Sequence, residues 1–81
     1  NSTVYVADSK NNRIVAWSVN GTEGEVVAGG NGEGDGDHQL NNPTDVILDE
    51  TGRNLIISDT GNRRIVCWPS QNGLRGKIII A

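Results

Sequence analysis

Residues 4–17 and 55–68 carry one pattern twice, and this internal repeat restricts the possible folds more than any other feature of the chain. VYVADSKNNRIVAW aligns without a gap to LIISDTGNRRIVCW. Identical residues stand 51 positions apart, and they pair Asp8 with Asp59, Asn11 with Asn62, Arg13 with Arg64 and Trp17 with Trp68. Beyond the tryptophans the match continues at an offset of 52, with Gly-Glu-Val-Val against Gly-Lys-Ile-Ile. A fixed period of this length is typical of a repeat architecture.

Each copy is built from short runs with the composition of β-strands. The runs are rich in Val and Ile, and Asn-Gly, Thr-Gly and similar turn signals separate them. Their nearly continuous apolar character indicates sheets that are covered on both faces. The pattern predicts an all-β fold with a three-strand set and a four-strand set: residues 3–8, 12–18 and 25–29, then 44–49, 54–59, 63–68 and 76–81.

Four-stranded antiparallel sheets that recur at this spacing and stack through both faces describe the blades of a β-propeller. The 81 residues would then form a single segment of roughly two blades. Residues 1–30 would be an incomplete blade that lacks its innermost strand, and residues 44–81 would be a complete blade. Residues 31–43 would be the crossover loop between them.

The segment LNNPTDVILDETGRNLIISDTGNRRIVCW, residues 40–68, resembles the NHL repeat. That pattern runs Leu-x-x-Pro-x-x-Val, a strand, Asp-x-x-Gly, and a strand that ends in Asp-x-x-Asn-x-Arg followed by Ile or Val. The residues that match it are Leu40, Pro43, Val46, Asp49, Gly52, Asp59, Asn62, Arg64 and Ile65. The first copy keeps the Asp-x-x-Asn-x-Arg-Ile part but not the Leu-x-x-Pro part. The resemblance implies a propeller, commonly of six blades.

Two stacked blades would leave an apolar sheet face uncovered on each side. Propellers close with ~4 to 8 blades, and large exposed apolar faces mark association surfaces. Copies joined head to tail form a ring where the rotation closes. We therefore expect either a homo-oligomer, with a trimer that closes a six-bladed ring favoured, or a segment that stacks on the remaining blades of a parent protein.

Composition narrows the range of partners. Seven basic against ten acidic side chains give a formal net charge of −3, so we expect no nucleic-acid partner. No apolar run approaches the ~18 residues that span a bilayer, and we expect no membrane association. The single cysteine, Cys67, cannot form an internal disulfide. Asn1 and Asn20 begin N-glycosylation acceptor triplets, which tilt an otherwise unknown location toward the cell exterior.

The stretch GGNGEGDGDHQL, residues 29–40, places glycine between polar or acidic side chains in the manner of a calcium loop. If Asn31 is position 1 of an EF-hand loop, positions 3, 5 and 7 are filled by Glu33, Asp35 and Asp37. Position 12 is then Asn42 rather than the bidentate Glu of an EF-hand, and no helices are predicted beside the loop. A flexible connector is favoured over a weak cation site, and we expect no metal or cofactor.

The repeated residues are expected to serve structure rather than chemistry. We expect Asp8 and Asp59 to bond turn amides, and Arg13 and Arg64 to pair with a carboxylate or carbonyl group. The recurrence of the pair in both copies disfavours a catalytic or recognition role. The repeated tryptophans are expected to pack between blades. His38 is the only histidine and has no Cys near it, so neither a zinc site nor a catalytic triad is predicted.

In an antiparallel four-strand blade, the crossover and the turn between the second and third strands emerge on the same side. Residues 30–43 should therefore lie beside residues 9–12 and 60–63 and form one rim with them. Binding sites commonly lie in loops that a rigid frame carries. The candidate ligand-binding residues of this rim are Lys10, Asn11, Asn12, Glu33, Asp35, Asp37, His38, Asn62 and Arg63.

These features favour a non-enzymatic binding or scaffold module that assembles through its blades and recognises a protein or polar ligand at the rim. One alternative is a fragment of a six-bladed propeller enzyme, a metal-assisted lyase or hydrolase, for which the innermost strand offers Asp45 and Asp49. A second is an RNA-binding propeller, which the acidic crossover opposes. A third is an engineered or evolutionary fragment whose only property is self-assembly.

Overall fold

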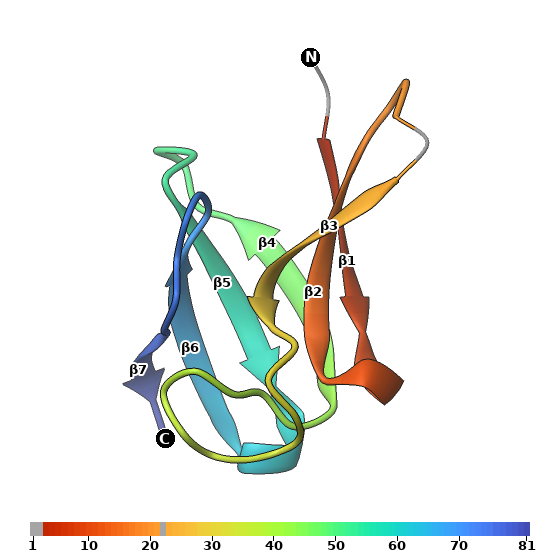
Figure 1. The fold of residues 1–81 in the computed structure, drawn as a ribbon. Helices are drawn as coiled ribbons and strands as arrows, with labels where there is room; N and C mark the ends of the chain where they lie inside the picture. Colours follow the sequence, from red (N-terminus) through yellow and green to blue (C-terminus); the bar gives the residue numbers. More distant parts are fainter. Residues whose placement is uncertain (1–2, 22) are drawn as a thin grey trace.

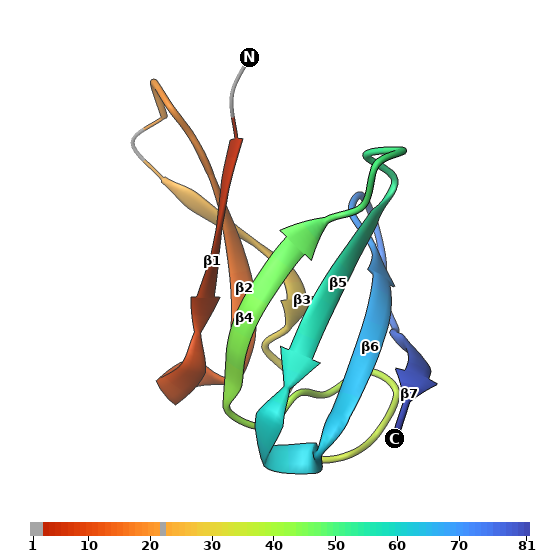
Figure 2. The ribbon, with the colours of Figure 1, turned by 180° about the vertical axis from the view of Figure 1, so that it is seen from behind.

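The computed structural model describes residues 3–21 and 23–81, which form an all-β protein of two antiparallel sheets. In both sheets each strand pairs with its neighbours in chain order. The first sheet consists of β1 (Thr3–Asp8), β2 (Arg13–Ser18) and β3 (Gly24–Gly29). The second sheet consists of β4 (Pro43–Leu48), β5 (Asn54–Asp59), β6 (Arg64–Pro69) and β7 (Lys77–Ile80). The sheets lie together at the lower end of Figure 1 and diverge toward the upper end, as the reverse view also shows (Figure 2).

The two copies of the repeat have the same strand register. Asp8 and Asp59, the last residues of β1 and β5, each lie opposite the arginine that opens the next strand. The ladder to the outermost strand shifts register at the same point in both sheets, after Ile14 in β2 and after Ile65 in β6. The likeness of the two sequences therefore extends to their backbone pairing.

A short 3₁₀ turn, which the sequence analysis does not predict, joins the two matched strands of each copy. These turns are η1 (Ser9–Asn11) and η2 (Thr60–Asn62). Each ends in a residue with a left-handed backbone, Asn12 and Arg63, both at φ 55°. Because these residues belong to the turns, β2 and β6 begin one residue later than predicted. No helix among residues 3–21 and 23–81 is long and apolar enough to cross a membrane.

The remaining strand boundaries differ from the predicted ones by a residue or so. β4 begins at Pro43, which the sequence assigns to the crossover, and it ends before Asp49 because that residue opens a hydrogen-bonded turn. Gly24 extends β3 at its start, Pro69 extends β6 at its end, and β7 is shorter than the predicted 76–81. The three-strand and four-strand sets themselves are as predicted.

The core of the protein lies between the two sheets. Its buried cluster consists of Ile14, Ala28, Leu40, Leu55, Ile57, Val66 and Trp68. Successive residues of a strand point to opposite faces, so β5 contributes Leu55 and Ile57 to this layer, and β6 contributes Val66 and Trp68. Leu40 enters from the crossover and is 0% exposed. Burial of this apolar surface is the main favourable contribution to folding.

The repeated tryptophans have different surroundings. Trp68 is 1% exposed and belongs to the core between the sheets, as expected. Trp17 is 41% exposed on the outward face of the first sheet and does not pack between the two sheets of this chain, so its expected packing between blades stays a prediction. The surroundings differ because the face of the second sheet that carries Trp68 meets the first sheet, whereas no described residue covers the matching face of the first sheet.

The turns at the end away from the crossover are closed by their own polar groups. Between β4 and β5, the Asp49 carboxylate accepts hydrogen bonds from Thr51 Oγ1 at 2.7 Å and from Asn54 Nδ2 at 3.0 Å. These hydrogen bonds, from Thr51 first and then from Asn54, lower the pKa of Asp49 to about 2. Between β6 and β7, Trp68 Nε1 donates to Gly73 O at 3.0 Å.

Candidate functional site

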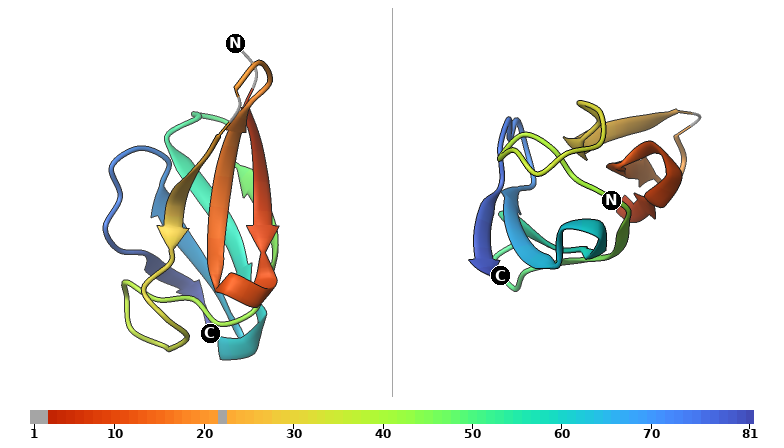
Figure 3. Two further views of the ribbon diagram at one scale, coloured as in Figure 1. Left: turned by 45° about the vertical axis from the view of Figure 1, so that its right-hand side comes forward. Right: turned by 90° about the horizontal axis from the view of Figure 1, so that it is seen from below.

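Three loops gather at one end of the molecule, namely residues 9–12, 30–42 and 60–63 (Figure 1; Figure 3, right). We call these three segments the rim. The first turn holds both ends of the crossover. Asn12 O accepts a hydrogen bond from Gly30 N at 3.0 Å, and Asn12 Oδ1 accepts one from Asn42 N at 2.9 Å. The structure thus places the crossover beside the first turn, as the connectivity predicts.

The second turn holds the middle of the crossover. Asn62 Nδ2 donates to Gly34 O at 2.8 Å, and Gly61 N donates to Asn41 O at 2.7 Å. A Cβ atom on residue 61 would lie 2.5 Å from Asn41 O, so this close approach requires glycine. The matching residue of the first turn is the exposed Lys10.

Arg64 binds the crossover through its backbone carbonyl groups. Its Nη1 donates to Asp35 O at 2.9 Å, and its Nη2 donates to Gly36 O at 3.1 Å and to Gln39 O at 3.0 Å. Its Nε donates to Asp59 Oδ2 at 2.7 Å. The planar guanidinium thus satisfies the polar backbone of a loop that no strand pairs along its length. The crossover is fastened to the second sheet, in contrast to the flexible connector that the sequence favours.

Asp59, the anionic partner of Arg64, is fully buried. Besides the Arg64 bond, its Oδ2 accepts a hydrogen bond from Asn62 Nδ2 at 2.8 Å, and its Oδ1 accepts one from Asn41 N at 2.7 Å. Within the described residues its side chain makes no capping bond to the turn that follows, so the expected contact with turn amides is wrong. The turn instead brings the Asn and Arg of Asp-x-x-Asn-x-Arg back onto one carboxylate.

The same cluster in the first sheet is open to solvent. Arg13 Nε donates to Asp8 Oδ2 at 2.8 Å, and Asn11 Nδ2 donates to the same oxygen at 3.0 Å. The side chains of Arg13 and Asp8 are 38% and 28% exposed, against 8% and 0% for Arg64 and Asp59. The hydrogen bonds from Asn11 and then Arg13 hold the pKa of Asp8 below its usual value. Within residues 3–21 and 23–81, Arg13 has no carbonyl partners like those of Arg64.

Backbone carbonyl oxygens of the crossover bind the guanidinium group of Arg64 rather than a metal ion. Carbonyl groups of residues 35, 36 and 39 converge on the Arg64 guanidinium. Asn42, at position 12 of the EF-hand count, has a left-handed backbone with φ 51° and donates its N–H to the first turn. In the described part of the chain, no three His, Cys, Asp or Glu side chains converge in a way that could hold a metal ion.

The exposed and engaged members of the rim differ in what they can do. Of the predicted ligand-binding residues, those exposed to solvent are Lys10, Asn11, Glu33, Asp35, Asp37, His38 and Arg63. Asn12 and Asn62 are half-buried, and their amides hold the crossover rather than face a ligand. Arg75, which the sequence analysis does not assign to the rim, joins it because Gly76 N donates to Asp37 O at 2.6 Å. Arg75 Nη1 lies 3.5 Å from Asp37 Oδ2, and His38 Nδ1 lies 3.8 Å from Asp37 Oδ1.

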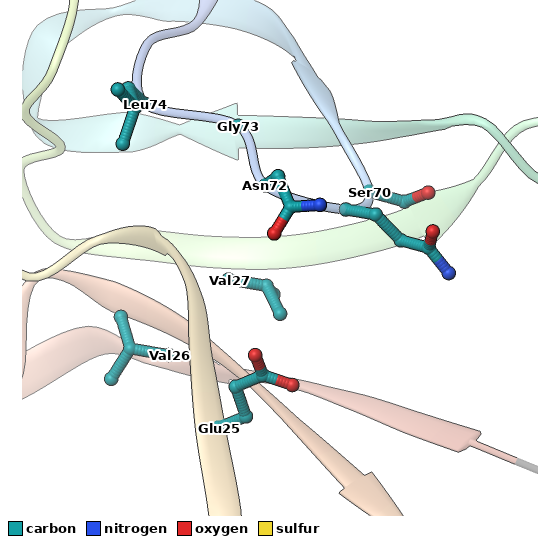
Figure 4. A pocket seen from close by; sticks show the side chains of 8 residues that line it. Glu25, Val26, Val27, Ser70, Asn72, Gly73 and Leu74 are labelled. Atoms are coloured by element: carbon teal, nitrogen blue, oxygen red, sulfur yellow. The ribbon is translucent and has the colours of Figure 1, made fainter.

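Two pockets of about 410 Å³ each flank the second sheet. One lies between the crossover and strands β6 and β7, and is lined by Asp35, Asp37, Arg64, Val66, Gly76 and Ile78. The other lies between β3 and the β6–β7 connection, away from the rim. Figure 4 shows Glu25 and Asn72 extending toward each other from its two walls. The pocket beside the crossover adjoins the rim, and its lining combines the charged Asp35, Asp37 and Arg64 with the apolar Val66 and Ile78.

The remaining candidate residues lie apart from the rim. Asp45 is exposed on β4, where its Oδ1 accepts a hydrogen bond from Val46 N at 2.9 Å, while Asp49 closes a turn at the opposite end. Asn20 is exposed in the connection between β2 and β3, where a glycan would project into solvent. Asn1 lies outside the described residues.

Comparisons of the chain with models of protein families, with curated proteins and with solved structures gave no match. The likeness to the NHL pattern therefore stays a prediction, carried by residues 40–68 and by their shorter copy at residues 4–17. Function is therefore inferred from the side chains of the rim and from the exposed faces of the two sheets.

Proposed function

We propose that the chain is a non-enzymatic binding or scaffold module, an NHL-like propeller segment whose two sheets act as blades. The segment completes a ring with further copies of itself, three copies giving the six blades of the resemblance, or with the remaining blades of a parent protein. The completed ring presents the rim to a protein or polar ligand. The observation that carries the proposal is a charged, exposed rim fastened to the sheets by buried groups.

The fastening matters because a loop that is already ordered loses less conformational entropy when it binds. Arg64 and Asp59 flank the second turn of the rim, their side chains are 8% and 0% exposed, and both accept or donate hydrogen bonds that hold the crossover. The acidic side chains of Glu33 and Asp35 remain exposed above this support. Charged side chains on an ordered loop favour recognition of a ligand by hydrogen bonds and complementary charge.

The role of the sheets as blades is supported by how they meet and by what they leave exposed. They pack face to face through one apolar layer. Large apolar side chains remain on their other faces, including Val4 at 53% exposure and Ile47 at 61%. Contiguous exposed apolar surface marks a contact with another molecule.

Binding rather than catalysis is favoured by the engagement of the buried acid. Asp59 already accepts hydrogen bonds from Arg64, Asn62 and the backbone of Asn41, and it is 0% exposed, so it presents no oxygen to a substrate at the surface. The histidine is exposed beside Asp37, and its backbone carbonyl group accepts a hydrogen bond from Asn31 Nδ2. These groups build the rim and do not form a reaction centre.

The test uses a phage-displayed library of random linear peptides, selected against the purified chain. Selected peptides are then titrated while backbone amide NMR shifts are recorded. We expect the shifts to cluster on residues 9–12, 30–42 and 60–63. Glu33→Lys should weaken binding at least tenfold, because it reverses a charge of the rim. Glu50→Lys, an equal charge reversal in an exposed turn at the opposite end, should leave binding unchanged.

Two outcomes would overturn the proposed binding function. One is a set of shifts that maps to the opposite turns or to a sheet face. The other is equal weakening by Glu33→Lys and Glu50→Lys, which would show that net charge rather than the rim determines binding.

A further inference from the structure

The outward face of the first sheet carries apolar side chains that have no cover in the described chain. Val4 is 53% exposed, Val6 and Trp17 are each 41% exposed, and Val26 is 45% exposed. A pocket of about 400 Å³ lies on this face beside Val6, Arg13 and Trp17. The face is therefore hollowed as well as apolar.

The same face is buried in the other copy of the repeat. The repeat aligns Val4, Val6, Val15 and Trp17 with Leu55, Ile57, Val66 and Trp68. These four partners are 0%, 0%, 1% and 1% exposed, because in the second sheet this face packs on the first sheet. The contact between the two sheets therefore shows which kind of surface covers a face with this pattern.

Trp17 lies over the glycine of the neighbouring strand, as its buried counterpart does, although a different edge of the indole faces the glycine. A Cβ atom on Gly24 would meet the Trp17 ring, with Cε2 at 2.7 Å, because the indole lies over the glycine of the neighbouring strand. Gly76 stands in the same relation to the Trp68 ring, with Cε3 at 2.6 Å. An exposed tryptophan that already lies against its own sheet loses less conformational freedom when it receives a partner.

The ion pair beside this face, Arg13 and Asp8, also lacks, among the described residues, contacts that its counterpart in the second sheet makes. Both terminal nitrogens of Arg64 donate to carbonyl oxygens, and its side chain is 8% exposed. Arg13 donates to Asp8 through Nε, and its side chain is 38% exposed. A guanidinium group has five N–H donors in a fixed fork, so Arg13 can donate further hydrogen bonds to oxygen atoms of a docked molecule. Docking would bring the first cluster toward the state of the second.

The opposite outward face, on the second sheet, matches the surface that fills this role within the chain. The repeat aligns Ile56, Ser58, Ile65, Cys67 and Ile80 with Tyr5, Ala7, Ile14, Ala16 and Ala28. Strand pairing puts the first group on one face, because Ile56 lies opposite Cys67, Ser58 opposite Ile65, and Ile65 opposite Ile80. Ile14 and Ala28 belong to the buried layer, with Tyr5 and Ala7 packed against it. Isoleucine is kept at its centre, and small residues stay small at two positions.

We propose that the outward face of the first sheet binds the outward face of the second sheet of another copy of this chain, in the manner of the contact inside each chain. This inference rests on the proposed function, since it names the surfaces through which the segments would assemble. The contact is heterologous, because one face of each copy meets the other face of the next. It leaves the rim free at one end of the assembly.

The test compares two variants with the wild-type chain by light scattering after size exclusion. Trp17→Glu places a charge on the first face, and Ile65→Glu places the same charge on the second. The wild type should assemble, and each variant alone should be monomeric. An equimolar mixture should form dimers with twice the mass of one chain. Trp17→Glu keeps the unaltered second face, and Ile65→Glu keeps the unaltered first face that binds it. Near-native fluorescence of Trp68 reports folding, and Val6→Glu replaces Trp17→Glu if the latter unfolds.

Three results would overturn this docking. They are a wild-type chain that stays monomeric, a single variant that assembles as well as the wild type, and a mixture of folded variants that does not form dimers. The second result would indicate contact between two identical faces. Glu33→Lys serves as the control, since a rim substitution should leave assembly unchanged. A monomeric wild type that still binds peptides at the rim would refute the docking and spare the binding function.

Discussion

The two repeated arginines offer a comparison in which the same substitution should have very different consequences. Arg64→Ala removes the Nε bond to buried Asp59 and three bonds to crossover carbonyl groups. Arg13→Ala removes one bond to Asp8, a carboxylate that solvent still reaches. The two positions are equivalent in strand order, in register and in the preceding 3₁₀ turn, so they differ mainly in burial and in the crossover bonds of Arg64.

The magnitude follows from that difference in burial. Loss of one partner of a buried ion pair costs ~3–5 kcal/mol, because the remaining charge is left uncompensated. Asp59 is 0% exposed and would keep only hydrogen bonds from Asn41 and Asn62. Exposed pairs contribute ~0–1 kcal/mol, and the 38% and 28% exposure of Arg13 and Asp8 places them nearer that class. We expect a difference of about 3 kcal/mol between the variants.

The assay is urea unfolding of both variants in the Trp17→Glu background, where assembly should not contribute to stability. A domain of this size has a free energy of unfolding of roughly 4–12 kcal/mol, so a stabilising osmolyte is added to all samples to give Arg64→Ala a full folded baseline. Adding Asp59→Asn to Arg64→Ala should recover part of the loss, since it removes the stranded charge. Equal destabilisation by Arg64→Ala and Arg13→Ala would refute this reasoning, as would no recovery in the double variant.

Three further perturbations test other parts of the structure. Gly61→Ala should cost ~1–3 kcal/mol in urea unfolding, because the new methyl group would lie 2.5 Å from Asn41 O; an unchanged midpoint would contradict the close approach. Asp49 has its pKa lowered to about 2, so its contribution to stability is complete above its usual value of 3.8 and is lost as pH falls through about 2. Asp49→Asn should therefore flatten that acid loss when unfolding is followed over pH, and an unchanged profile would count against the assignment. Trp68→Ala should destabilise the monomer by ~3–5 kcal/mol, whereas Trp17→Ala should cost no more than about 2 kcal/mol; similar losses would contradict their different burial.

The sequence predicts the strand sets and their arrangement because both follow from local pattern. Apolar, β-branched runs and turn signals delimit each strand, and the repeat indicates that the two copies share one pairing scheme. The 3₁₀ turns were missed because Ser-Lys-Asn and Thr-Gly-Asn have the composition of any polar turn. The one-residue shifts at β2 and β6 follow from these turns, since Asn12 and Arg63 have left-handed backbones.

The fastening of the crossover could not be read from local pattern, because it depends on which sheet surface lies beneath the loop. Arg13 and Arg64 stand at matching positions of the repeat, yet among residues 3–21 and 23–81 only Arg64 donates hydrogen bonds to crossover carbonyl groups. The signal that could have found it is the polar backbone of residues 30–42, which must find partners at a sheet end. The exposure of Trp17 has the same origin, since stacking order decides which of two equivalent faces is covered.

The most direct test of ring completion by self-assembly is the mass of the wild-type chain in solution, measured by light scattering across a wide dilution series. We predict one discrete species with the mass of three chains, stable to dilution, as three two-blade segments closing a six-bladed ring require. A monomer at every concentration would contradict assembly through the sheet faces. Open-ended growth with concentration would contradict closure, because it would show that the head-to-tail contact does not return on itself.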